Sequence, residues 1–328
     1  NIVKEKVLPL PTPFGAPLEL YKNTWGNPNN EALALVSGLH GDHLQGIHLN
    51  LQLAQFLDSV VEGSHPDYTL KGQVISFPVV NLNAIQCGSR LAPADGMDMN
   101  LAFPGNPQGE TSEALASAIL THTAECYWGL ILQSAPPHYE DAPHIQTLQL
   151  DSSTKKLCRN LKLETVRQLK PSPAHKVSLA YQWQQHDILT AILSSGSPRT
   201  VNIQQCETLF QSIIHFMKAE GILKDRRKIK TNTTTKPHFY PPENDVSIFA
   251  NTAGMFLKEV KVGTPIEKGQ TIGEIRDLYS GKRLEEIIAP TEGFLLTLRQ
   301  YPIVYEKEPL ATLLTAKKSW RNILPWSK

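Results

Sequence analysis

The feature that most constrains the fold is a short apolar run that ends in a polar turn and is followed by a helical pattern. Residues 32–36 are Ala-Leu-Ala-Leu-Val, the polar turn spans residues 38–43, and apolar residues recur at helical spacing over residues 49–57. This order predicts a buried strand, a turn and an amphipathic helix. A polar turn at the end of a buried strand is also where open α/β sheets place their ligands.

The same alternation continues along the chain. Further strands are predicted at residues 73–80, 128–132 and 188–193, and further helices at about residues 112–124 and 204–220. Strands that alternate with helices predict an α/β domain, with a mixed, mainly parallel sheet and helices on both faces.

The pattern of apolar residues changes after residue 237. Short apolar segments separated by glycines, such as Gly254, Gly263 and Gly273, predict a small all-β, barrel-like domain at the C-terminal end. A length of 328 residues with 41% hydrophobic content suits two domains. The predicted boundaries are residues 1–223 for the α/β domain, 224–237 for a charged and Thr-rich linker, 238–316 for the β domain and 317–328 for a tail.

Composition excludes several classes of partner. Lys and Arg total 32 against 31 Asp and Glu, so no overall field would attract nucleic acid or an anionic membrane. The four cysteines form no C-x-x-C pair, and no apolar run of about 18 residues occurs. We therefore expect no nucleic acid and no membrane as partners, and a cytoplasmic protein with reduced thiols.

His40 and His43 lie three residues apart in the turn after the first predicted strand. Two imidazoles at this spacing can converge on one metal ion. Alone, an H-x-x-H pair is weak evidence, because polar turn residues without any ligand are more common.

The segment around this pair resembles the first metal motif of the succinylglutamate desuccinylase and aspartoacylase family, whose pattern is H-G-x-E-x-x-G. His40, Gly41 and Gly46 match, and His43 stands where the family has its glutamate ligand. Residues 88–90 and 98–105 resemble the family signatures G-x-R and D-L-N-R-x-F-P-G. The chain is identified as a divergent member of this family of zinc-dependent amide hydrolases, which implies a zinc carboxypeptidase-like fold with a degenerate metal site.

The resemblance also implies roles for the second block of residues. Arg90 takes the place of the arginine that polarises the scissile carbonyl, and with Asn100 it would bind the substrate carboxylate. Leu101 replaces the family's second arginine, so one paired contact to a carboxylate is lost. His144 follows Pro143, as in the family's downstream Pro-His, and is a third candidate for substrate binding.

Two further positions of the resemblance carry replaced side chains. Gln133 aligns with the third metal ligand, a histidine, and an amide is a poor zinc ligand beside an imidazole. Ser194 aligns with the general base, a glutamate, and cannot take a proton from water near neutral pH.

These replacements lead to a first hypothesis: a non-hydrolytic homologue in which zinc binding is weak or absent. It would bind a small carboxylate or N-acyl amino acid ligand, or act as a partner of an active subunit within a homo- or hetero-oligomer.

The alternative is an active amide or ester hydrolase with a rearranged metal site. Its ligands would come from His40, Asp42 and His43, with further donors from a predicted loop that carries His138, Glu140, Asp141 and His144. A third and remote hypothesis uses Cys87 as a nucleophile.

Overall fold

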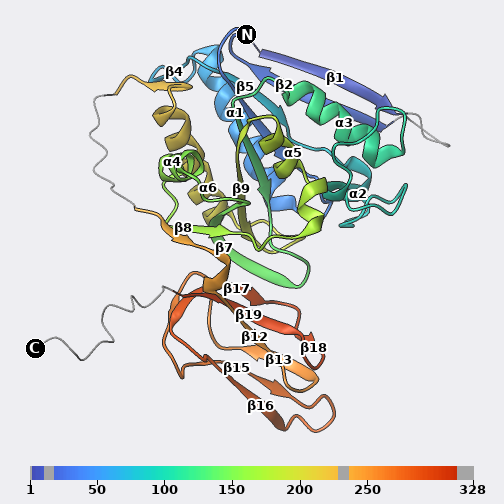
Figure 1. Cartoon of the computed structure of the whole chain (residues 1–328), viewed down its shortest axis with the longest axis vertical. Helices are drawn as coiled ribbons and strands as arrows, with labels where there is room; N and C mark the ends of the chain where they lie inside the picture. Colours follow the sequence, from blue (N-terminus) through green and yellow to red (C-terminus); the bar gives the residue numbers. More distant parts are fainter. Residues whose placement is uncertain (1, 11–17, 228–235, 316–328) are drawn as a thin grey trace, which may run out of the picture. The chain divides into compact units, whose positions relative to one another are not determined.

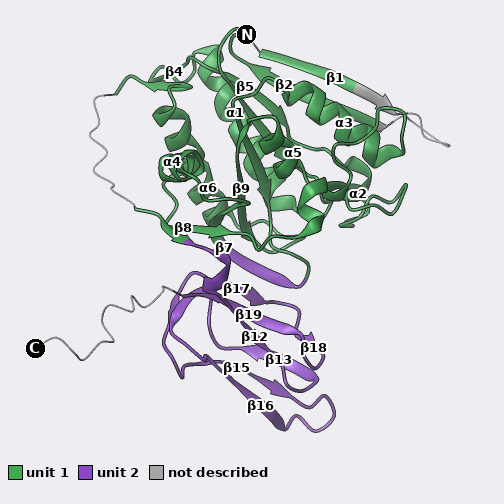
Figure 2. Cartoon of the chain, viewed as in Figure 1, with its two compact units in different colours: residues 1–137, 143–239 green, residues 138–142, 240–328 purple. Residues whose placement is uncertain are grey.

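The computed structural model describes residues 2–10, 18–227 and 236–315 (Figure 1). The chain divides into two compact units, coloured separately in Figure 2. Unit 1 comprises Asn1–Pro137 and Pro143–Phe239, and unit 2 comprises His138–Ala142 and Tyr240–Lys328. Each unit is described by itself below.

Unit 1 contains the α/β sheet. Its strands run in the order β1-β2-β5-β3-β6-β9, in which β5, β3, β6 and β9 are mutually parallel and β1 and β2 are antiparallel additions at one edge. The bounds are β1 (Ile2–Leu10), β2 (Leu18–Trp25), β3 (Ala32–Ser37), β4 (Tyr68–Leu70), β5 (Gln73–Phe77), β6 (Trp128–Gln133), β8 (Thr165–Gln168), β9 (Leu189–Gly196) and β10 (Leu223–Asp225). The division between the units passes through β7 (Tyr139–Thr147) and β11 (His238–Tyr240).

Helices cover both faces of this sheet because the central strand β3 is apolar on both. Leu33 and Leu35 pack in one core with α1, α4 and α6, whereas Ala34 and Val36 pack in a second core with α3 and α5. The helices are α1 (Leu44–Glu62), α2 (Leu82–Gln86), α3 (Thr111–Thr123), α4 (Ser152–Leu161), α5 (Leu179–Gln185) and α6 (Ile203–Ala219), with short 3-10 turns η1 (Met99–Leu101) and η2 (Pro173–Val177). The predicted fold class is confirmed.

Unit 2 is built from β strands around its own core. A four-stranded sheet runs in the order β16-β15-β13-β18, and β17, β19 and β12 pair in a second group. The bounds are η3 (Pro242–Asn244), β12 (Asp245–Phe249), β13 (Gly254–Lys258), β14 (Pro265–Ile266), β15 (Thr271–Arg276), β16 (Arg283–Ile288), β17 (Gly293–Arg299), β18 (Ile303–Val304) and β19 (Pro309–Leu314). Its buried apolar residues, among them Phe256, Leu295 and Leu310, belong to unit 2 alone, which agrees with the predicted small β domain.

Two local predictions differ from the structure, and a third is not tested by it. The segment predicted as a loop near His138 is largely strand β7, and residues 138–142 belong to unit 2 rather than to the α/β domain. The predicted linker begins inside β10, which pairs with β4 through Asp225 and Tyr68. The predicted tail at residues 317–328 lies outside the described residues. Within the described ranges, every helix is too short or too polar to cross a membrane.

Candidate active site

The turn after β3 places His40, Asp42 and His43 at the carboxyl end of the parallel sheet. All three side chains are buried, each residue being 3% exposed. The rings of His40 and His43 meet edge to face with 4.6 Å between their centroids. The turn is held close to its neighbours by two glycines: a Cβ on Gly41 would lie 2.1 Å from the carbonyl carbon of Ala84, and one on Gly46 would lie 2.3 Å from the Leu132 carbonyl oxygen.

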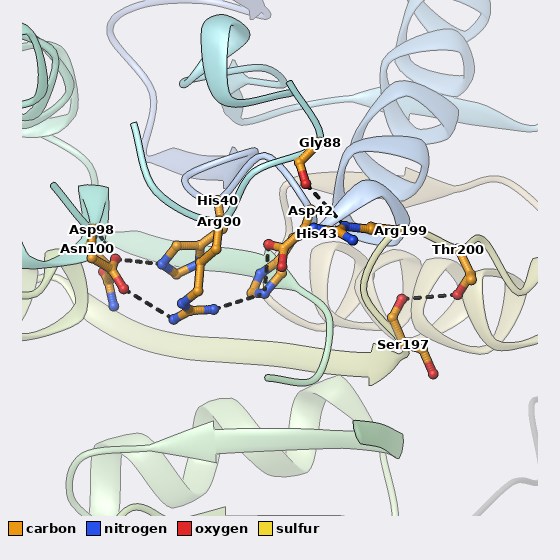
Figure 3. Close-up of polar contacts among 10 residues, drawn as sticks. All are labelled: His40, Asp42, His43, Gly88, Arg90, Asp98, Asn100, Ser197, Arg199 and Thr200. Atoms are coloured by element: carbon orange, nitrogen blue, oxygen red, sulfur yellow. Dashed lines mark hydrogen bonds and ion pairs between the residues drawn. The ribbon is translucent and has the colours of Figure 1, made fainter. Parts of the chain in front are cut away.

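Asp98 joins this turn to the segment that carries Arg90 (Figure 3). Its Oδ1 lies 2.6 Å from His40 Nε2 and accepts the Asn100 backbone N–H at 3.0 Å, and its Oδ2 lies 3.2 Å from Arg90 Nη2. Burial alone would raise the pKa of Asp98, but the hydrogen bond from His40 and the charges of His40 and Arg90 outweigh it and lower the pKa to about 2. Asp98 is therefore an anion that anchors both side chains.

Arg90 lies between Asp98 and His43. Its Nη1 is 3.4 Å from His43 Nε2, and because a guanidinium only donates, His43 accepts through Nε2 and carries its proton on Nδ1. Burial, together with the charges of His40 and Arg90, lowers the pKa of His43 well below its usual value. His43 is thus a neutral acceptor.

Asn100 and Leu101 differ in how the structure uses them. Figure 3 places Asn100 beside Asp98, and its Oδ1 accepts the Leu179 backbone N–H at 3.4 Å, at the start of α5. Leu101 is 45% exposed and supplies no polar contact at the position of the family's second arginine.

Gln133 and Ser194 lie opposite one another at the ends of the adjacent parallel strands β6 and β9. Gln133 Nε2 donates to Gln146 Oε1 at 3.3 Å, and Gln146 Nε2 lies 3.0 Å from His144 Nε2. His144 is fully buried, so this chain of amides connects the Gln133 position to a buried imidazole. Ser194 is also fully buried.

The donors proposed for a rearranged metal site are not all in one unit. His138, Glu140 and Asp141 belong to unit 2, where Asp141 accepts from Thr297 Oγ1 at 2.7 Å and Glu140 accepts from Gln300 Nε2 at 2.9 Å. Cys87 is exposed at the end of α2.

A zinc ion at this cluster would have to be held by His40, Asp42, His43 or Gln133. Two buried atoms, His40 Nδ1 and Asp42 Oδ1, have no hydrogen-bond partner among the described residues, and the bond of His40 Nε2 to a carboxylate is the orientation that metal-binding histidines use. His43 Nε2, however, faces the Arg90 cation, and Gln133 contacts Gln146. In the described part of the chain no group of three His, Cys, Asp or Glu side chains is placed to hold a metal. The donor set does not fit zinc.

Asp98 contacts both His40 and Arg90 but was not predicted as a site residue. Asp98 opens the D-x-N segment of the second motif, so its position was visible in the sequence, but the motif alone does not say that it holds His40 and Arg90 together. Asp42 was predicted only as a ligand of the rearranged metal site; its Oδ1 is buried without a hydrogen-bond partner among the described residues and lies 3.7 Å from His43 Nε2.

Comparison with known proteins connects this site to a family. Residues 29–134, which contain the turn, Arg90, Asp98 and Gln133, match the family model for the succinylglutamate desuccinylase/aspartoacylase catalytic domain. The N-alpha-acetyl-L-2,4-diaminobutyric acid deacetylase of Halomonas elongata is 24% identical over 286 residues, which cover 82% of this chain and 77% of that protein.

Solved structures agree with this match. A succinylglutamate desuccinylase/aspartoacylase from Rhodobacter sphaeroides superposes with a TM-score of 0.77 at 19% identity over 95% of both chains. The product-bound ectoine utilization protein EutE (DoeB) from Ruegeria pomeroyi gives 0.79 at 19% identity, over 96% of this chain and 95% of that one. The resemblance of this chain to the succinylglutamate desuccinylase and aspartoacylase family is therefore confirmed, by the catalytic-domain match over residues 29–134 and by the fold.

Proposed function

We propose that this chain is a non-hydrolytic homologue of the N-acyl amino acid deacylases that binds a small carboxylate or N-acyl amino acid ligand through Arg90. The observation that carries the proposal is the placement of the Arg90 guanidinium, which is anchored by Asp98 and His43 yet has a side chain that remains 32% exposed. A guanidinium has five N–H donors. Among the described residues, contacts to His43 and Asp98 use two of these donors, which leaves three for a ligand oxygen.

The proposed absence of hydrolysis is supported by the side chains at the other positions. Hydrolysis of an amide requires an activated water and a base that accepts its proton. At the base position Ser194 is a hydroxyl, and His43 already accepts from Arg90. Arg90 could still polarise a carbonyl, but neither the Ser194 hydroxyl nor the His43 imidazole that accepts from Arg90 supplies a base for water at neutral pH.

Weak or absent zinc binding is part of the same proposal. The loss of a contact outside the ligand set already weakens metal sites roughly 10- to 100-fold, so two replaced ligands should weaken zinc binding at least 100-fold relative to a homologue with His, Glu and His. Stoichiometric zinc that survives dialysis against a mild chelator would contradict this.

The rearranged metal-dependent hydrolase is the second candidate, and one observation favours it. Among the described residues, the buried His40 Nδ1 and Asp42 Oδ1 have no hydrogen-bond partner, although Asp42 Oδ1 lies 3.7 Å from His43 Nε2, and a cation bound by both atoms would supply the missing contact. The lack of a third ligand among the described residues counts against it.

A pair of assays separates the two candidates. Release of free amino acid from N-acetyl and N-succinyl substrates is measured with and without added zinc, and thermal denaturation is measured with increasing N-acetylglycine. We expect no turnover, and a stabilisation of about 2.7 kcal/mol at 100 times the dissociation constant. Arg90→Ala should abolish this stabilisation. Arg226→Ala, which removes an exposed guanidinium that contacts Thr69, should leave it unchanged.

The opposite results are equally clear. Turnover that disappears in His40→Ala and His43→Ala would establish the metal-dependent hydrolase. A ligand shift that persists in Arg90→Ala would remove Arg90 as the anion-binding group. The expectations of an active partner subunit, of a homo- or hetero-oligomer and of a cytoplasmic location stay predictions.

A further inference from the structure

Arg199 has a backbone conformation that residues other than glycine rarely adopt. It lies three residues beyond the end of β9, with φ at +61°, in the left-handed region that favours glycine. Its backbone N–H donates to the Asp42 carbonyl at 2.7 Å, so the strained residue is fixed against the turn that carries His40 and His43. Strained residues of this kind persist where the surrounding structure requires them, and they are frequent at functional sites.

The side chain of Arg199 reaches a second segment of the site. Its Nε donates to the Gly88 carbonyl at 3.1 Å, two residues before Arg90 (Figure 3). Arg199 therefore connects the turn after β3 to the segment that carries the anion-binding guanidinium. The backbone of this segment is also bonded to α2, since the Gly88 N–H donates to the Ile85 carbonyl at 3.0 Å and the Ser89 N–H to the Ala84 carbonyl at 2.8 Å.

We propose that Arg199 is a positioning residue for Arg90, an inference that rests on the function proposed above. Arg90 must keep one N–H group on Asp98 and another near His43 while it presents the rest to a ligand. Displacement of the segment near Gly88 would move the guanidinium away from both partners. The Nε–H bond of Arg199 holds that segment to the residues that follow β9, and its role does not depend on the positive charge.

The geometry permits a test that separates the hydrogen bond from the charge. A glutamine amide nitrogen and an arginine Nε are attached to the same atom of the side chain, Cδ, so Arg199→Gln keeps a donor toward Gly88 without the charge. Arg199→Met has a similar length and no donor. Both variants keep the same backbone strain, so they differ in the bond alone.

Binding of N-acetylglycine is measured by titration calorimetry for the full chain and these variants. We expect Arg199→Gln to bind within about twofold of the wild type and Arg199→Met to bind at least about tenfold more weakly, since small misplacements of a binding group have large effects. Equal binding by Arg199→Met and the wild type would overturn the proposal. Binding by Arg199→Gln as weak as that of Arg199→Met would also overturn it, because the charge would then be the functional property.

A third variant tests the strain. Arg199→Gly relieves the left-handed backbone, so it should bind weakly while its melting temperature stays equal to or above that of Arg199→Met. Lys162→Gly is the matched control, because Lys162 is also left-handed, at φ +55°, but ends α4. It should not change binding. If the wild type itself fails to bind, or if Arg90→Ala binds as well as the wild type, the proposed function fails and this inference fails with it. Loss confined to the Arg199 variants leaves the proposed function in place.

Discussion

Replacement of Asp98 by asparagine should weaken the contacts to His40 and Arg90 and lower the free energy of unfolding by a predictable amount. Asn keeps an oxygen that can accept from His40 Nε2 and from the Asn100 N–H, as Asp98 Oδ1 does at 2.6 and 3.0 Å. The other amide atom is then an NH₂ group that faces Arg90 Nη2, at a position where Asp98 Oδ2 lies 3.2 Å away. An ion pair is thereby replaced by two opposed donors.

The loss of stability can be estimated from the exposure of the ion pair between Asp98 and Arg90. The Asp98 and Arg90 side chains are 17% and 32% exposed, so the ion pair is worth about 1 kcal/mol rather than the larger value of a buried pair. Loss of charge on the acceptor of the His40 bond removes about 1 kcal/mol more. Asp98→Asn should therefore reduce the free energy of unfolding by about 1–2 kcal/mol. For a unit of this size the melting temperature should fall by about 2–8 °C.

Tryptophan fluorescence during urea unfolding measures this effect in unit 1. Trp25, Trp128 and Trp183 are buried there, and Trp320→Phe and Trp326→Phe in all variants remove the two tryptophans that lie outside the described residues. Asp187→Asn is the control, because Asp187 is exposed and its φ of +59° suits asparagine equally well. An unfolding midpoint for Asp98→Asn equal to that of the control would refute the anchoring role of Asp98.

Three further predictions concern other parts of the chain. A thiol reagent should label Cys87 rapidly in the folded chain and the other cysteines only after unfolding, because Cys126, Cys158 and Cys206 are buried and burial raises their pKa values to about 12, 12 and 11. Hydrogen bonds from Arg227 and Lys218 lower the pKa of Asp225 well below 3.8, so its contribution to stability is present above pH 3.8 and decreases as the pH falls. Asp225→Asn should therefore lower the free energy of unfolding at pH 7, and the difference in unfolding free energy between the variant and the wild type should shrink as the pH is lowered in urea unfolding series. His43→Glu combined with Gln133→His should restore more zinc affinity than the two single changes together, and independent effects in calorimetry would show that the positions do not share one ion.

The α/β unit was predictable because its strands are apolar on both faces. Residues 32–36 have no polar side chain, and such runs indicate a buried parallel strand. Strand β7 was predicted as a loop because Glu140 and Asp141 are charged and two prolines precede them. Its polar side chains are satisfied by residues more than 150 positions away, Thr297 and Gln300, which a local pattern cannot reveal.

The candidate site was predictable in its members but not in its contacts. The motifs identified His40, His43, Arg90 and Asn100, and these lie together. The motifs did not reveal that Asp98 contacts both His40 and Arg90, or that Gln133 contacts Gln146, because these contacts depend on side-chain orientation. The strained conformation of Arg199 is likewise a tertiary feature, since nothing in the local sequence requires a positive φ there.

The two glycines of the first motif explain why it identifies the fold better than the activity. Gly41 and Gly46 are fixed by backbone atoms of Ala84 and Leu132 that lie within 2.1 and 2.3 Å of where a Cβ would be, so any larger residue would push whole elements apart. The side chains of His43 and Gln133 contact the side chains of Arg90 and Gln146, so an exchange at either position alters the chemistry and leaves the backbone contacts of the sheet in place. Gly46→Ala should therefore destabilise unit 1 far more than His43→Ala, by several kcal/mol against about 1–2 kcal/mol in the tryptophan unfolding assay. Comparable losses for the two variants would show that the motif is maintained by its polar contacts rather than by the packing of its backbone.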